Sequence, residues 1–346
     1  MIVRTPSRIA HAAAASLGVL VACIAAPAQP DDVRGAQPQP RIAHTADPAA
    51  VQDRFPAARV QTLLARANFS PGLIDAKPGR KTRIAVEQLQ RAKGLEITGT
   101  LDDTTLNALA AADPLAATKD WCRVYTITAE DCDLITGPIP EDWNERAALD
   151  RSGYADMTEL LAERGWCAVE LARALNPETD LDTLTAGDEV VLPDVRVKPL
   201  PKLSRVVIDL TEKLVLGYGP TSESEPDSAA PLVMLTHCSI ARMAEKRPVG
   251  ELHVKVIATD PEYTFNPADW PEIDNVTSKL RIPPGPRNPV GVAWIGLDKP
   301  GYGMHGTVRP QDIGKTGSHG CFRLCNWDAA RLARAVRVGT AVEVRE

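Results

Sequence analysis

The stretch "GYGMHGTVRPQDIGKTGSHGCFRLCNWD", residues 301–328, decides how the C-terminal part of this 346-residue chain is interpreted. It contains two histidines, His305 and His319, and two cysteines, Cys321 and Cys325. Such residues can build a metal centre, a redox-active disulfide, or a cysteine nucleophile with a histidine base. Their spacing and the surrounding sequence distinguish these three kinds of site.

The spacing gives little support to a metal centre or a redox disulfide. In an extended segment, His319 and Cys321 point to opposite faces. The Cys-x3-Cys spacing of residues 321–325 differs from the tight knuckle of structural zinc sites. It also differs from the Cys-x-x-Cys motif of redox proteins, and no βαβ pattern flanks it. Both alternatives stay open, but the sequence favours a nucleophile.

A cysteine nucleophile accounts for the pattern best. A free thiol is only a few per cent ionised at neutral pH, so it needs an imidazole at hydrogen-bond distance. His305 can reach Cys321 if their two segments return as neighbouring strands, and an imidazolium beside the sulfur would lower the pKa of the thiol. The glycines of "GSHGC" allow close backbone approach, and the N–H groups there can face a developing oxyanion.

A mainly β domain is predicted around this stretch. "SRVVIDLTEKLVLGYG", residues 204–219, alternates apolar and polar residues about a turn, which is typical of a hairpin. The long Pro-rich stretch 261–289 has the character of a functional loop. Further short strands are expected at 230–239, 250–260, 290–297 and 340–346, with a helix at 327–336.

Several motifs in register resemble the L,D-transpeptidase (YkuD) family over about residues 199–346. "YGMHGT" and "SHGCFRLCN" resemble its active-site signature, and "RPVGEL" and "NPVGVAWIGL" precede them in family order. The resemblance implies that Cys321 is the nucleophile and His305 the proton acceptor and donor. Arg247 stands where the family usually has Thr, and Cys325 lies unusually near the nucleophile. No metal or cofactor is implied.

The resemblance also implies supporting residues around this pair. The residues expected to form or support the oxyanion site are His319, Gly320, Ser318 and Gly306. The residues expected to bind substrate are Arg323, Asn326 and Tyr302. Arg323 is expected to meet a substrate carboxylate. His237 and His253 are expected to be ordinary strand residues.

The N-terminal part of the chain has a helical period. Three segments at 58–69, 79–95 and 101–110 predict a small three-helix domain that closes a core of its own. Their order resembles the peptidoglycan-binding type 1 family. That family usually has Asp-Gly where this chain has Asp75-Ala76, and a glycine there permits positive φ, so this turn is expected to be altered.

The middle part has the order strand, helix, helix, strand. "VYTIT", "MTELLAERGW", "AVELARALN" and "TAGDEVVLP" supply these four elements. They resemble a LysM repeat, which recognises N-acetylglucosamine-containing glycans. An insertion of residues 130–154 separates the first strand from the first helix.

The first residues have the features of an export signal. Arg4 and Arg8 precede a short apolar stretch that ends in small residues. Cleavage after "APA" would leave Gln29 first, whereas "LVAC" resembles a lipobox that would leave Cys23 lipidated. Export favours pairing of exposed cysteines, and a disulfide among Cys122, Cys132 and Cys167 is preferred.

Composition excludes other classes of protein. A net charge of −6 argues against nucleic-acid binding, and no apolar run after residue 30 is long enough to span a membrane. The chain is therefore predicted to be a multidomain α+β protein of the periplasm or cell envelope. Its predicted parts are a signal peptide (1–28), a linker (29–54), a helical domain (55–113), a LysM-like segment (121–198) and a catalytic domain (199–346).

The predicted function is peptidoglycan L,D-transpeptidation through a cysteine acyl-enzyme on tetrapeptide stems. An L,D-carboxypeptidase or an enzyme that anchors proteins to peptidoglycan would use the same residues. The non-enzyme alternative is a tether that only binds the wall.

Overall fold

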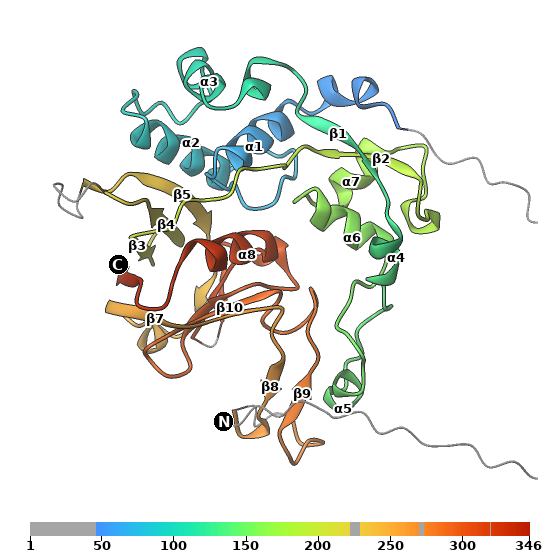
Figure 1. Ribbon diagram of the computed structural model, residues 1–346, viewed down its shortest axis with the longest axis vertical. Coiled ribbons are helices and arrows are strands. Elements are labelled where there is room, and N and C mark those ends of the chain that lie inside the picture. The colour runs from blue at the N-terminus through green and yellow to red at the C-terminus, as the bar shows by residue number, and fades with distance from the viewer. Residues whose placement is uncertain (1–45, 222–228, 270–272, 319) are drawn as a thin grey trace, which may run out of the picture. The chain divides into compact units, whose positions relative to one another are not determined.

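The C-terminal part is built on one sheet of eight strands, in the order β13-β11-β10-β7-β14-β3-β4-β5 (Figure 1). The computed structural model describes residues 46–221, 229–269, 273–318 and 320–346. The pairs β11–β13 and β3–β14 are parallel and the other five are antiparallel. The strands are β3 (Arg205–Asp209), β4 (Leu214–Tyr218), β5 (Leu232–His237), β7 (Gly250–Thr259), β10 (Ala293–Leu297), β11 (Gly303–His305), β13 (Phe322–Arg323) and β14 (Ala341–Arg345).

Helix α8 (Asn326–Ala335) packs on this sheet against β7, β10 and β11 (Figure 1). Its buried Leu332 and Ala329 join a core with Ile295, Met304 and Val254 from the strands. The predicted hairpin at 204–219 is confirmed as β3 and β4, and the predicted C-terminal helix and last strand as α8 and β14.

The Pro-rich stretch contains a small hairpin of its own. Strands β8 (Tyr263–Phe265) and β9 (Leu280–Ile282) pair antiparallel. Trp143, which opens α5 (Trp143–Ala147), stacks on Phe265 with 4.1 Å between the ring centroids. The hairpin is therefore anchored by the middle part of the chain.

The N-terminal part contains α1 (Pro56–Arg66), α2 (Arg80–Ala92) and α3 (Asp103–Ala110). The expectation that these helices close a core of their own is wrong. Leu64 and Leu89 share one apolar cluster with Val207 and Leu216 of the sheet. The amphipathic pattern identified the buried faces, but it could not tell which partner covers them.

The backbone of residues 68–70 also joins the edge of the sheet. The Ser70 N–H donates to the Leu235 carbonyl, and the Leu235 N–H donates to the Asn68 carbonyl, both at 2.9 Å. The N–H and carbonyl of Leu235, on edge strand β5, are thereby satisfied within the chain.

The middle part pairs β1 (Cys122–Thr126) with β2 (Glu189–Pro193) antiparallel, and α6 (Met157–Arg164) and α7 (Val169–Leu175) lie between them in sequence. Helix α4 (Ala129–Asp133) and α5 fall in the predicted insertion. The preferred disulfide is absent, since Cys122, Cys132 and Cys167 are all free thiols. Cys122 and Cys167 are instead buried in the apolar core of this part. Within the described ranges, no helix has the length and apolar character needed to cross a bilayer.

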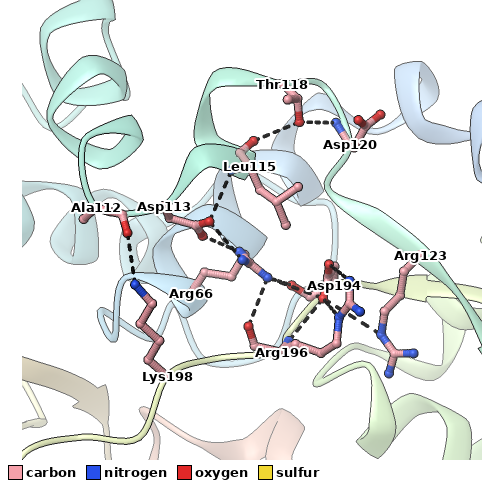
Figure 2. Close-up of polar contacts among 10 residues, drawn as sticks. All are labelled: Arg66, Ala112, Asp113, Leu115, Thr118, Asp120, Arg123, Asp194, Arg196 and Lys198. Carbon is pink, nitrogen blue, oxygen red and sulfur yellow. Dashed lines mark hydrogen bonds and ion pairs between the residues drawn. The ribbon is translucent and has the colours of Figure 1, made fainter.

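An ionic network around the buried Asp194 joins the helical and middle parts (Figure 2). Arg66, at the end of α1, binds both carboxylate oxygens of Asp113 at 2.5 and 3.0 Å. Its guanidinium also lies 3.4 Å from Asp194, which directly follows β2. Burial opposes ionisation of Asp194, but hydrogen bonds from Arg196 and the charge of Arg66 outweigh it and lower the pKa of that carboxyl.

The turn at Asp75-Ala76 keeps its backbone conformation without glycine. Ala76 has a φ of 58°, so the expected alteration of this turn does not occur. The buried Gln61 side chain holds the turn, because its carbonyl oxygen accepts from the N–H groups of Asp75 and Ala76 at 3.0 and 2.9 Å. Alanine in this region is strained by about 1–2 kcal/mol.

We expect Ala76→Gly to raise the free energy of unfolding by about 0.5–1 kcal/mol, because glycine relieves that strain at a smaller cost in chain entropy. Urea denaturation measures this change in the free energy of unfolding. Ala108→Gly, inside α3, is the matched control and should destabilise by about 1 kcal/mol. Equal losses in the two variants would contradict this account of the turn.

We expect Arg66→Met to lower the free energy of unfolding by about 2 kcal/mol, because Asp113 loses its bidentate charged partner while Asp194 keeps its ion pair with Arg196. The side chains of Arg66 and Asp194 are only 12% and 4% exposed. The control Arg80→Met removes an exposed ion pair with Glu212 and should cost less than about 1 kcal/mol. Similar effects in both variants would refute a structural role for the network.

Candidate active site

The parallel pairing of β11 with β13 brings the cysteine and histidine segments together. Met304 lies opposite Phe322 and His305 opposite Arg323. The Leu324 N–H extends this pairing by donating to the His305 carbonyl at 2.8 Å. Cys321, one residue before β13, therefore lies level with Gly303, as the sequence prediction of neighbouring strands requires.

The loop before Cys321 is held from two sides. Strand β12 (Thr316–Ser318) pairs with β6 (Ile240–Ala241), and the Ser318 hydroxyl donates to the Cys321 carbonyl at 2.6 Å. The Arg247 guanidinium donates to the Ala241 carbonyl at 3.1 Å. Arg247, the departure from the family's usual Thr, thus supports the short strand that positions this loop.

His305 is a buried, neutral imidazole. Its Nδ1 lies 2.6 Å from the Gly306 carbonyl oxygen, which can only accept, so Nδ1 carries the proton and Nε2 keeps a lone pair. Burial lowers the pKa of His305 to about 4. Trp294, opposite His305 on β10, packs beside the ring with 5.7 Å between the centroids. The geometry therefore gives a neutral imidazole whose Nε2 can accept a proton.

Cys321 rests as a neutral thiol. Its Sγ donates to the Gly301 carbonyl oxygen at 3.4 Å. Burial raises the pKa of the thiol, although the Gly303 N–H and the Arg323 charge act in the opposite direction. The expectation of a lowered thiol pKa is therefore wrong for this arrangement, because burial disfavours the charged forms of both Cys321 and His305.

The supporting glycines differ in their surroundings. A Cβ on Gly306 would lie 2.2 Å from the Asn326 side-chain oxygen, so this position has room only for glycine. A Cβ on Gly320 would lie 3.5 Å from the Tyr302 ring, which places Tyr302 beside the loop before the thiol. His319 lies outside the described residues, and its oxyanion role stays a prediction.

Arg323 faces a cationic cavity of about 300 Å³. The basic residues Arg242, Arg309 and Lys315 line it together with Arg323, against the single acidic side chain of Asp312. Burial lowers the pKa of Arg323, which is consistent with a guanidinium kept from bulk water. This charge distribution suits a carboxylate, as expected for Arg323.

Asn326 is not brought to that cavity. It is 2% exposed, and its amide nitrogen donates to Glu163 of α6 and to the Pro286 carbonyl, each at 3.1 Å. Its predicted contact with substrate stays a prediction, and its observed contacts are structural. Cys325 is also buried, which raises its pKa well above the usual value and makes it unreactive.

The other two predicted strand histidines have ordinary partners. The buried His237, at the end of β5, donates from Nε2 to the Lys81 carbonyl at 3.1 Å. The half-exposed His253, in β7, lies 3.3 Å from Asp298. Sequence analysis missed the Gly301 carbonyl and Glu163 as neighbours of the site. Gly301 lies in the quoted stretch, but Glu163 is too distant in sequence for any pattern to connect it.

Two family models match the chain. Residues 204–344 match the model described as the L,D-transpeptidase catalytic domain, YkuD. Residues 57–109 match the model described as a putative peptidoglycan binding domain. Neither model covers the middle part between them, so its likeness to LysM stays a prediction.

Relatives carry matching names. The putative L,D-transpeptidase YkuD of Bacillus licheniformis is 46% identical over 61 residues, which are 18% of this chain and 37% of that protein. The putative L,D-transpeptidase YqjB of Bacillus subtilis is 36% identical over 105 residues, 29% of this chain and 52% of that protein. The chain thus spans about half or less of these relatives.

Solved structures include L,D-transpeptidase 3 from Mycobacterium tuberculosis, at 19% identity over 47% of this chain and 76% of that chain, with a TM-score of 0.31. The catalytic-domain model and the names of the relatives agree on the L,D-transpeptidase family. The chain therefore carries a YkuD-type L,D-transpeptidase catalytic domain together with a putative peptidoglycan-binding domain.

Proposed function

We propose that this protein is a peptidoglycan L,D-transpeptidase in which Cys321 is the nucleophile and His305 the general base. The observation that carries the proposal is the parallel β11–β13 pairing, which sets the thiol level with the strand that ends in His305. The Nε2 lone pair of a neutral imidazole supplies the base without a metal or cofactor.

In the first half of the reaction, Sγ attacks the carbonyl carbon of the third residue of a tetrapeptide stem. The thiol proton passes to His305 Nε2, and the oxyanion forms beside the loop 318–321. His319 and Gly320 would support that oxyanion together with the Cys321 N–H. The C–N bond then breaks, the terminal D-Ala leaves with the proton from Nε2, and a thioester remains on Cys321.

In the second half, an acceptor attacks the thioester. The side-chain amine of a second stem gives its proton to Nε2 and forms a new amide as the C–S bond breaks, which restores the thiol. Water as acceptor would make the protein a carboxypeptidase, and a protein lysine would make it an anchoring enzyme. The cationic cavity at Arg323 supports recognition of the donor's carboxylate.

The remaining parts fit an enzyme of the cell envelope. The proposed architecture keeps a three-helix peptidoglycan-binding domain at 55–113, a LysM-like segment at 121–198 and the catalytic domain at 199–346. A signal at residues 1–28 would export the chain to the periplasm, with Cys23 as a possible site of lipid attachment. These first residues lie outside the described structure.

Incubation of the purified protein with a disaccharide-tetrapeptide tests the reaction. We expect a cross-linked dimer that has lost one D-Ala, read by mass spectrometry, and no product from Cys321→Ala. The control Cys325→Ser should keep activity, because that thiol is buried away from solvent. Tripeptide alone would indicate the carboxypeptidase, and unchanged substrate would support the wall-binding tether.

The pH dependence tests the neutral pair. Because the pKa of His305 is about 4, acylation should persist as the pH falls to about 5 and be lost as Nε2 becomes protonated. Alkylation of Cys321 by iodoacetamide should have its midpoint at or above the ordinary thiol value of about 8.5. His305→Gln should slow acylation about 100-fold or more and leave the alkylation midpoint nearly unchanged.

An alkylation midpoint well below about 8.5 that rises in His305→Gln would contradict the neutral pair. It would instead support a thiolate–imidazolium pair of Cys321 and His305. Unchanged acylation in His305→Gln would mean that another residue is the base.

A further inference from the structure

A second and larger cavity, of about 620 Å³, lies against helices α6 and α7, and we name it the α6 cavity. Its other walls come from the 286–287 and 308–311 loops and from Trp327. Its volume is that of a typical small-molecule site. Much of its wall belongs to the middle part of the chain, outside both matched family models.

The α6 cavity contains a half-buried carboxyl group, Glu163, that has no basic partner among the described residues. Glu163 accepts hydrogen bonds from the Tyr154 hydroxyl and the Asn326 amide, both at 3.1 Å. Among the described residues, no lysine or arginine forms an ion pair with Glu163. Burial raises its pKa to about 7, although these hydrogen bonds favour the charged form. An ammonium group on a ligand would supply the missing positive charge.

The same cavity offers buried donors on another wall. The Nε of Arg287 and the Nε1 of Trp327 are buried and have no hydrogen-bond partner in the described part of the chain. The Nε of Arg287 lies 3.5 Å from a Glu159 carboxylate oxygen, so the two terminal nitrogens of the guanidinium remain as donors for a further anion. Arg309 lines both the α6 cavity and the cationic cavity that contains Arg323.

We propose that the α6 cavity binds the zwitterionic end of a diamino acid in a peptidoglycan stem, with its ammonium group on Glu163 and its carboxylate on Arg287 and Arg309. The described lining of the cavity holds arginines and carboxylates in equal number: Arg146, Arg173, Arg287 and Arg309, and Asp156, Glu159, Glu163 and Glu170. A ligand that carries both charges can pair with residues of both signs, whereas a ligand of one sign meets like charges.

The position of Arg309 suggests what this binding achieves. Because Arg309 lines both cavities, a stem held in the α6 cavity lies next to the cationic cavity beside the reactive loop. That the ligand is a peptidoglycan stem rests on the proposed function. That the ligand is a zwitterion rests on the charged residues of the α6 cavity alone. The α6 cavity thereby holds a stem beside the catalytic domain.

Isothermal titration calorimetry tests the site with free 2,6-diaminoheptanedioate as the probe. The full chain is used with Cys321 blocked by iodoacetamide, so that the probe cannot react. We expect saturable one-to-one binding, and no binding of heptanedioate, which has the carboxylates but lacks the amines. Glu163→Gln and Arg287→Ala should each weaken binding about tenfold or more, as loss of a charge-assisted contact does.

Arg281→Ala is the matched control, because Arg281 pairs with Glu262 on the surface outside the cavity, and it should bind as the unsubstituted chain does. Unfolding midpoints establish that each variant is folded. Absence of binding, equal binding of heptanedioate, or unchanged affinity in folded Glu163→Gln and Arg287→Ala would overturn the proposal. Failure of the proposed function appears separately, as no acylation of the unblocked chain by a tetrapeptide donor.

Discussion

The parallel contact between β11 and β13 is the constraint on which the site depends. These strands are only three and two residues long, so few ladder hydrogen bonds hold them. The Arg323 N–H and carbonyl add a reciprocal pair of bonds to Ser239, at 3.0 and 2.9 Å. The Ser239 hydroxyl then donates to the Asp312 carbonyl at 2.8 Å, which ties the intervening loop to the same point. A weak local pairing is thus reinforced by bonds from elements distant in sequence.

The helical part of the chain contributes to this reinforcement. The Lys81 ammonium of α2 donates to the Ile313 carbonyl at 3.0 Å, within the loop between His305 and Cys321. The Ser70 and Thr236 hydroxyls both donate to the buried Asp328 carboxylate of α8, at 2.9 and 2.7 Å. The part that matches a peptidoglycan-binding model therefore also packs on the C-terminal sheet and holds the helix that follows Cys321.

Sequence analysis predicted the longer strands β3, β4, β5, β7, β10 and β14 and helix α8 because their apolar periods are regular. It proposed Cys321 and His305 because they lie in one short motif. It failed where the outcome depends on distant partners. Ala76 keeps a positive φ because Gln61, fifteen residues earlier, binds the turn. Asn326 matches the motif, but Glu163 of α6 binds its amide, and no local pattern reports such a contact. The thiol pKa was mispredicted because burial cannot be read from spacing.

Burial has opposite consequences for the pKa values of the two groups that we propose to react, and both consequences favour the same neutral state. It raises the pKa of Cys321 and lowers that of His305, so charge separation is disfavoured before substrate arrives. A neutral resting pair keeps the Nε2 of His305 free to accept a proton across a wide pH range. It also limits the reaction of the Cys321 thiol with electrophiles dissolved in the solvent. The charge then develops only when a substrate carbonyl is present to receive the sulfur. Donors that face the oxyanion would stabilise that state selectively, which is the condition for lowering the barrier rather than tightening binding.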